Sequence, residues 1–206
     1  MRVLMAGILV LTVAVSSWAV ELPAPRTDGG MGLFEALRKR ASASGGDFPT
    51  GRLEPEELSS VLWAATGLNR GEKGWTVPMS MGLEPYCKIY LAEDGGIFLY
   101  DWRDNDLREI SKENIRAKAG AQSFVKTAPH ILIVVTDGKA LAGFEESDRT
   151  AFAWVAAGAM TQDIYLAAAA LGAGTRYIHS MNLEEIRRAL QLEDGDDPLC
   201  LMMLGK

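Results

Sequence analysis

Residues 148–170 read DRTAFAWVAAGAMTQDIYLAAAA, and this stretch decides the fold. The Ser-Asp pair at 147–148 is suited to cap a helix, and the glycines at 172 and 174 are suited to end it. Between positions 151 and 159 such a helix has almost no polar face. Because a helix that is apolar nearly all round is buried, we expect this one to lie inside the domain or against another subunit.

The rest of the chain predicts shorter helices and strands around it. In the first helix, Leu33, Phe34 and Leu37 share one face. Two of the strands flank Glu93-Asp94-Gly95-Gly96, which predicts a hairpin. The expected helices cover residues 31–40, 54–67, 111–119 and 184–190, and the expected strands cover 87–92, 97–101, 131–136 and 199–204. Helices that come first, followed by a hairpin and isolated strands, predict an α+β fold and not a regular βαβ array.

The N-terminal stretch MRVLMAGILVLTVAVSSWAV has the features of a secretory signal. One cation, Arg2, precedes an apolar run, and small residues follow at Ser17 and Ala19, so cleavage is expected after Ala19. The run is also just long enough to span a membrane, which leaves an uncleaved anchor as the alternative. The expected organisation is a signal peptide at 1–19, an extended arm at 20–30 and one domain at 31–206. The protein is then expected to be periplasmic or secreted, without stable insertion into the membrane.

The composition excludes several classes of function. The 206 residues include 21 Lys and Arg against 27 Asp and Glu, a net charge of −6. Because Arg2 is the only charged residue before position 20, removal of the signal brings this to −7. An acidic chain without a basic stripe is unsuited to nucleic acid. Two cysteines and two histidines exclude a disulfide framework and argue against a metal site. Cys87 and Cys200 lie in apolar runs and are expected to be free, with a bridge as the alternative that export would permit.

A basic cluster, Arg38-Lys39-Arg40, is followed by Ser42 and Ser44. Cations and hydroxyls together suit a phosphate. Three cations at the end of a helix also complement the helix dipole and face water, and composition alone favours this second interpretation.

Four segments in order, at 36–70, 75–78, 95–107 and 159–172, resemble the nitroreductase superfamily. The nearest branch is that of small proteins similar to azoline-oxidising and SagB-type flavin enzymes. The similarity extends over residues 31–204. It implies an α+β homodimer with a central, mostly antiparallel sheet flanked by helices. It also implies FMN at the dimer interface and a long helix buried between the subunits.

The resemblance also assigns candidate cofactor residues. The family's phosphate motif, Arg-Arg-Ser-x-Arg at the end of the first helix, is matched by Arg40 and Ser42, whereas Ala41 and Ser44 stand where two other cations usually lie. The ring-lining motif, Arg-Thr-x-Pro-Ser followed by Asn, is matched in part by residues 75–80, and no Asn follows. The candidate cofactor-binding residues are Arg38, Arg40, Ser42, Ser44, Trp75, Pro78, Met79, Ser80, Gly172 and Lys206. No catalytic residue and no metal ligand is identified.

The function implied by the resemblance is an FMN-dependent oxidoreductase that exchanges hydride or electrons between a donor and a small organic acceptor. Export complicates the choice of donor, because nicotinamide cofactors are cytoplasmic. NAD(P)H and a quinol or other electron carrier therefore both stay open. The alternative is a degenerate member that has lost FMN and acts as a ligand-binding or partner-binding dimer.

Overall fold

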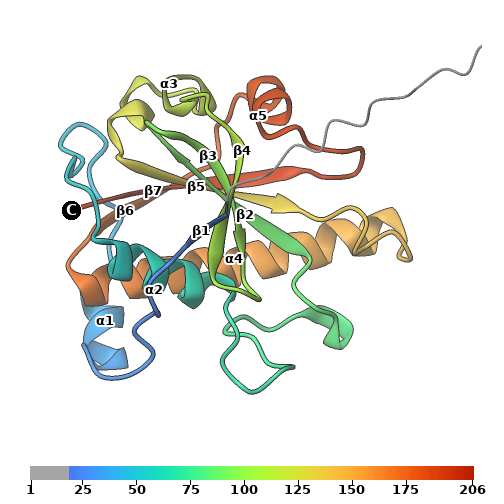
Figure 1. Ribbon diagram of the computed structural model, residues 1–206, viewed down its shortest axis with the longest axis horizontal. Helices are drawn as coiled ribbons and strands as arrows, with labels where there is room; N and C mark the ends of the chain where they lie inside the picture. Colours follow the sequence, from blue (N-terminus) through green and yellow to red (C-terminus); the bar gives the residue numbers. More distant parts are fainter. Residues whose placement is uncertain (1–18) are drawn as a thin grey trace, which may run out of the picture.

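The computed structural model describes residues 19–206 (Figure 1). The predicted signal peptide lies outside the described residues, apart from Ala19. The strands are β1 (Ala19–Glu21), β2 (Cys87–Glu93), β3 (Gly96–Asp101), β4 (Asp106–Ser111), β5 (His130–Thr136), β6 (Gly174–Ile178) and β7 (Pro198–Gly205). The helices are α1 (Leu33–Lys39), α2 (Pro55–Thr66), α3 (Arg116–Ala119), α4 (Glu146–Leu171) and α5 (Leu183–Leu190), with 3-10 turns at Ser80–Gly82 and Ser123–Thr127.

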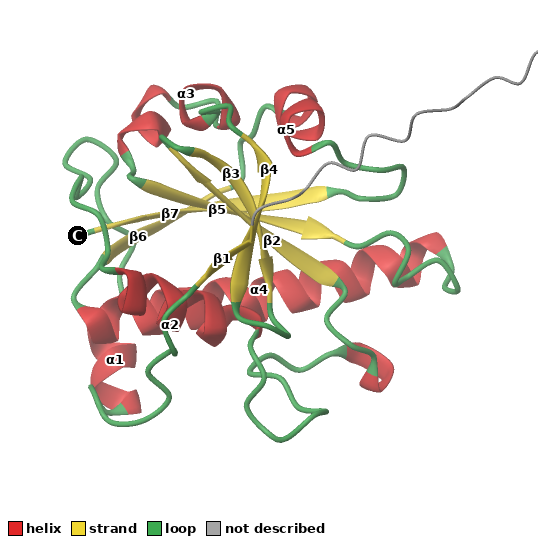
Figure 2. Cartoon of the chain, in the orientation of Figure 1, coloured by secondary structure: helices red, strands yellow, loops and turns green. Residues whose placement is uncertain are grey.

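The strands form one sheet in the order β1-β4-β3-β2-β5-β7-β6, and each neighbouring pair is antiparallel. Helices α2 and α4 cover one face, and α3 and α5 cover the other (Figures 1 and 2). The central strand β5 is buried along its whole length, as its continuous apolar run predicts. The predicted α+β fold with a mostly antiparallel sheet is confirmed.

Helix α4 is the long element that the sequence predicts, but only one of its faces is buried in this chain. Met160 and Ile164 pack into the core, whereas the opposite face leaves Trp154 and Val155 exposed, the latter to 64%. The helix begins one residue before Ser147, with Glu145 at the cap position, so the predicted capping pair is wrong. It ends at Gly172 as predicted.

Helix α1 is confirmed, but its apolar face is open. Leu33, Phe34 and Leu37 are all exposed, and Phe34 keeps 86% of its surface. Ala36 is the buried position of this helix. Two helices thus present large apolar side chains that nothing in residues 19–206 covers.

The largest error of the sequence-based prediction lies at residues 111–119, where a helix was expected. Ser111 ends strand β4, and only Arg116–Ala119 are helical. The sequence does not predict strand β4, because Asp106, Arg108 and Glu109 interrupt its apolar pattern, and Arg108 is exposed. The short edge strands β1 and β6 were missed for the same physical reason, since few of their side chains are buried.

The two cysteines do not form a disulfide. Both thiols are free and buried. Cys87 lies on β2 and Cys200 on β7, with β5 between them. Two strand spacings amount to about 10 Å, which exceeds the span of a disulfide. The alternative of a bridge is therefore wrong for this fold.

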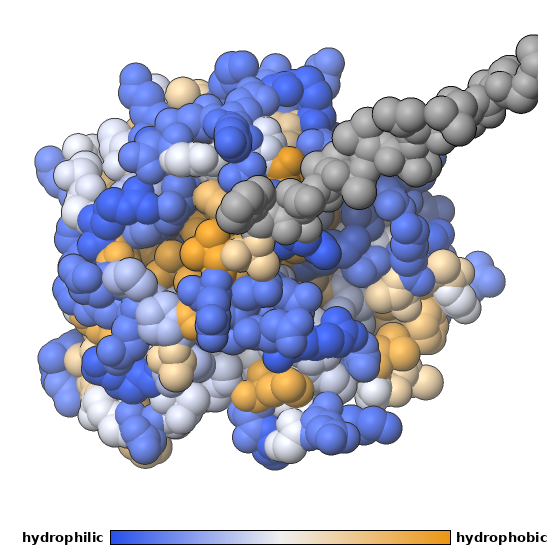
Figure 3. Space-filling model, in the orientation of Figure 1, coloured by the Kyte–Doolittle hydropathy of each residue, from blue (hydrophilic) through white to orange (hydrophobic). Residues whose placement is uncertain are grey.

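One face of the molecule is mostly hydrophilic, with small hydrophobic patches between the hydrophilic regions (Figure 3). Within residues 19–206, none of the helices combines the length and the apolarity needed to cross a bilayer.

Candidate functional site

The candidate phosphate residues lie where the chain leaves α1. Arg40 has left the helical conformation, and the segment after it runs alongside the edge strand β6. Ser42 forms a parallel bridge with Thr175, and the Ala43 N–H donates to the Thr175 carbonyl over 2.9 Å. This segment adds a short extra strand to the sheet and so fixes the position of Ser42.

Tyr165 of α4 joins the elements of this site, and sequence reasoning did not single it out. Its hydroxyl oxygen lies 2.6 Å from Ser42 Oγ and 3.0 Å from the backbone nitrogen of Tyr177 on β6. The Arg40 guanidinium lies 5.2 Å from the centre of its ring, within the range of a cation–π contact. Arg40 makes no ion pair within residues 19–206, so its charge is available.

The remaining cations and serine of the predicted phosphate site differ in their surroundings. Arg38 and Ser44 are exposed, and Arg38 has no ion-pair partner in the described part of the chain. Lys206 forms an ion pair with Glu57 on α2, and this interaction lowers the pKa of the Glu57 carboxyl. The backbone N–H and carbonyl of Lys206 also bond to Gly51, each over 2.8 Å. The Lys206 charge is therefore already compensated.

Gly172 has a conformational reason to be glycine. It ends α4 with a φ of 70°, in the left-handed region that favours glycine. This role accounts for the residue without any contact to a cofactor.

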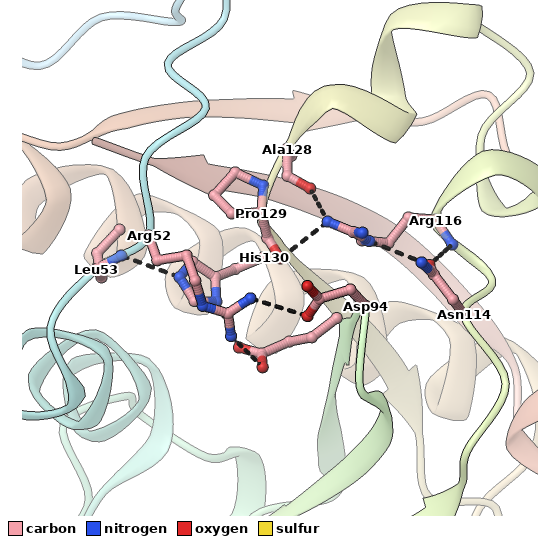
Figure 4. A network of polar contacts seen from close by, with 9 residues as sticks. Arg52, Leu53, Asp94, Asn114, Arg116, Ala128, Pro129 and His130 are labelled. Carbon is pink, nitrogen blue, oxygen red and sulfur yellow. Dashed lines mark hydrogen bonds and ion pairs between the residues drawn. The ribbon is translucent and has the colours of Figure 1, made fainter.

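A buried histidine anchors the segment that follows the phosphate residues (Figure 4). The Leu53 N–H donates to His130 Nε2 over 3.0 Å, so this nitrogen carries no proton. The proton of the neutral ring is then on Nδ1, which lies 2.6 Å from Glu93 Oε1. Arg52 pairs with both Glu93 and Asp94. Burial opposes the charge of Glu93, but His130 and Arg52 together hold its pKa below the usual value. Arg52 is thus fixed to the β2–β3 hairpin, and Leu53 is fixed to the start of β5.

The candidate ring-lining residues lie in the loop before β2. Trp75 packs edge-to-face on Trp102 with ring centres 5.9 Å apart, and its indole nitrogen is buried without an acceptor. Met79 is half-buried against the core and Pro78 is exposed. The Ser80 N–H donates to the Tyr86 hydroxyl over 3.2 Å.

The two halves of the candidate site do not meet within one chain. The Tyr86 hydroxyl beside Ser80 lies 3.4 Å from the Phe152 carbonyl, whereas the phosphate side contacts Tyr165. Phe152 and Tyr165 are 13 positions apart, which corresponds to about 20 Å along α4. The phosphate-side and ring-side residues therefore lie toward opposite ends of α4.

Comparisons with known proteins agree with this fold. Residues 38–206 match the model of the Nitroreductase family. A candidate nitroreductase of Methanocaldococcus jannaschii is 27% identical over 190 residues, covering 84% of this chain and 90% of the relative.

Solved structures agree as well. A candidate nitroreductase of Ralstonia eutropha JMP134 is 30% identical, covers 94% of this chain and 91% of its own, and has a TM-score of 0.86. The NADPH:FMN oxidoreductase of Vibrio harveyi, solved with NAD+, shares the fold at 21% identity and a TM-score of 0.63, over 84% of this chain and 67% of its own. With its sheet order and its long α4, the chain belongs to the nitroreductase family of oxidoreductases.

Proposed function

We propose that this protein is an exported, homodimeric oxidoreductase that binds FMN and reduces or oxidises a small organic molecule. The observation that carries the proposal is that Arg40 and Ser42 both contact Tyr165. An uncompensated cation and a hydroxyl are held together there at an open edge of the sheet. This donor set suits a phosphate monoester.

The residues present fit FMN at both ends. At the phosphate end, Arg40 and Ser42 would hold the charge, and the exposed Arg38 and Ser44 lie nearby in the sequence. At the ring end, the unpaired Trp75 indole N–H is a donor that lacks an acceptor. When bound, FMN supplies the redox chemistry by hydride exchange. The chain's own task is to bind the phosphate, orient the ring and exclude water from one side of it.

A second subunit would complete the site. The exposed apolar side chains of α1 and α4, among them Phe34 and Val155, supply a surface for it. Two chains packed antiparallel along the exposed face of α4 would bring the ring-side loop of one chain toward the phosphate-side residues of the other. We expect the purified protein to elute as a dimer, and Val155→Glu to shift it to the monomer by light scattering. A monomeric wild type would contradict this arrangement.

Export is supported by the sequence of residues 1–19. Cleavage after Ala19 would leave Val20 and Glu21 of β1 paired with β4. An intact mass of the exported protein that corresponds to a chain beginning at Val20 would support this step, and a mass that retains the first 19 residues would favour the anchored form. In either location the donor, NAD(P)H or a quinol-type carrier, would be found by testing each for flavin reduction under anaerobic conditions.

The test of FMN binding begins with the absorbance spectrum of the protein and a titration with FMN. We expect flavin bands, and we expect Arg40→Ala to lose FMN while it remains folded. Lys112→Ala, which removes an exposed cation in the β4–α3 connection, is the matched control and should retain FMN. If the wild type neither contains nor takes up FMN, the proposal is wrong.

One observation favours a second candidate, a family member that binds a ligand other than FMN. Lys206, the cation expected to assist with the phosphate, is paired with Glu57 instead. A non-flavin molecule that co-purifies with the protein, together with absent FMN binding, would support this candidate.

A further inference from the structure

The hydrogen bonds of Tyr165 have a direction that follows from their donors. A backbone N–H can only donate, so the Tyr165 oxygen accepts the bond from Tyr177 N over 3.0 Å. The phenol still has one proton of its own. Its other partner is Ser42 Oγ, at 2.6 Å.

Either hydroxyl can be the donor in the short Tyr165–Ser42 bond, and the burial of Tyr165 decides which one donates. If Ser42 donated its proton, the Tyr165 proton would have no acceptor within residues 19–206, although the residue is only 8% exposed. A buried donor without an acceptor is unfavourable. Tyr165 therefore donates to Ser42, and the proton of the exposed Ser42 hydroxyl remains free to point outward.

The same tyrosine also holds the cation of the site. The Arg40 guanidinium lies over its ring, on a side chain that has no carboxylate partner in the described chain. One buried side chain thus orients both a charged and a neutral donor. A chain of hydrogen bonds that all run in one direction strengthens its last member. The last member here is the Ser42 hydroxyl, and its best acceptor is an anionic oxygen.

We propose that Tyr165 is the positioning residue that makes this site selective for a phosphorylated ligand, so that FMN is preferred over riboflavin. This inference rests on the proposed function. The relay runs from the Tyr177 N–H through the Tyr165 hydroxyl to Ser42. Its effect is confined to the phosphate, because riboflavin ends in a neutral hydroxyl and has no anionic oxygens at that position. Tyr165 is not a catalytic residue, since it lies away from the candidate ring residues.

The test compares Tyr165→Phe with Tyr177→Phe. Each substitution removes one phenol oxygen. Tyr177 takes part in the relay only through its backbone N–H, so Tyr177→Phe keeps the relay intact. Dissociation constants for FMN and for riboflavin are measured by fluorescence titration for both variants and the wild type. We expect Tyr165→Phe to weaken FMN binding by about tenfold, at the upper end of the loss typical of one neutral hydrogen bond, and to leave riboflavin binding unchanged. Tyr177→Phe should change neither.

A second variant guards against a general disturbance of the fold. Ser42→Ala removes the end of the relay and leaves the Tyr165–Tyr177 bond intact. If the relay exists, the double variant with Tyr165→Phe should bind FMN no more weakly than Ser42→Ala alone. Equal losses for FMN and riboflavin, or additive losses in the double variant, would overturn the role of Tyr165. A wild type that does not bind FMN would instead overturn the proposed function, and the selectivity with it.

Discussion

Asp163 lies on α4 and is expected to destabilise the folded chain at neutral pH. The residue is partly buried and makes no hydrogen bond or ion pair with any other residue in the range 19–206. Burial raises the pKa of its carboxyl from 3.8 to about 6. The folded state therefore binds the proton more tightly than the unfolded state does, and the free energy of unfolding falls when the carboxyl loses its proton.

The magnitude follows from the shift. Two pKa units correspond to about 3 kcal/mol, and because the carboxyl is still partly in contact with water we expect about 1–2 kcal/mol. This penalty is absent below the unfolded pKa near 4. It grows as the pH rises through the folded pKa and is constant above about pH 7. Asp163→Asn, which cannot ionise, should stabilise the protein by that amount at pH 7.5 and by almost nothing at pH 4.

Urea denaturation at the two pH values measures the difference. Asp148→Asn is the matched control, because this exposed aspartate in the first turn of α4 complements the helix dipole and its loss should not stabilise. If Asp163→Asn destabilises the protein at pH 7.5, or if its effect is independent of pH, the reasoning is refuted. That result would show that the carboxylate has a partner, for which the second subunit of the proposed dimer is the first place to look.

Three further outcomes are expected. Burial raises the pKa of both the Cys87 and Cys200 thiols to about 12, so neither should react with a thiol reagent at pH 8 until urea is added, as mass spectrometry would show. Met160→Ala should lower the free energy of unfolding by about 2–5 kcal/mol in chemical denaturation, because this side chain is fully buried on the core-facing side of α4. Glu93→Gln should lower the free energy of unfolding by about 1–2 kcal/mol at pH 7. In the wild type that contribution is present above the unfolded pKa and is lost as the pH falls through the lowered folded pKa, so the two proteins should converge in titrations toward pH 3.

The elements with the strongest periodicity were predicted from the sequence. Helix α4, helix α2 and the β2–β3 hairpin follow directly from their apolar spacing and turn residues. Strands β4 and β6 were not predictable in this way, because they are stabilised by hydrogen bonds to neighbouring strands and not by burial of an alternating face.

The site shows the same division. Arg40 and Ser42 are two residues apart, so a local motif reveals them. Tyr165 contacts Ser42 across 123 positions and lies in an alanine-rich helix whose pattern indicates only a core residue. The anchoring by His130 is equally distant, since its partner Leu53 is 77 residues away. Contacts of this kind depend on tertiary packing, which periodicity and motifs do not encode.

The place of β7 in the sheet has a consequence for how the chain is made. This strand comes last in the described chain, yet it lies between β5 and β6 and pairs with both. While residues 198–205 are still inside the ribosome, the sheet lacks an inner strand, and β6 has only the short parallel bridge between Ser42 and Thr175. The sheet is therefore incomplete until residues 198–205 have been synthesised, and its pairing depends on contacts that form late.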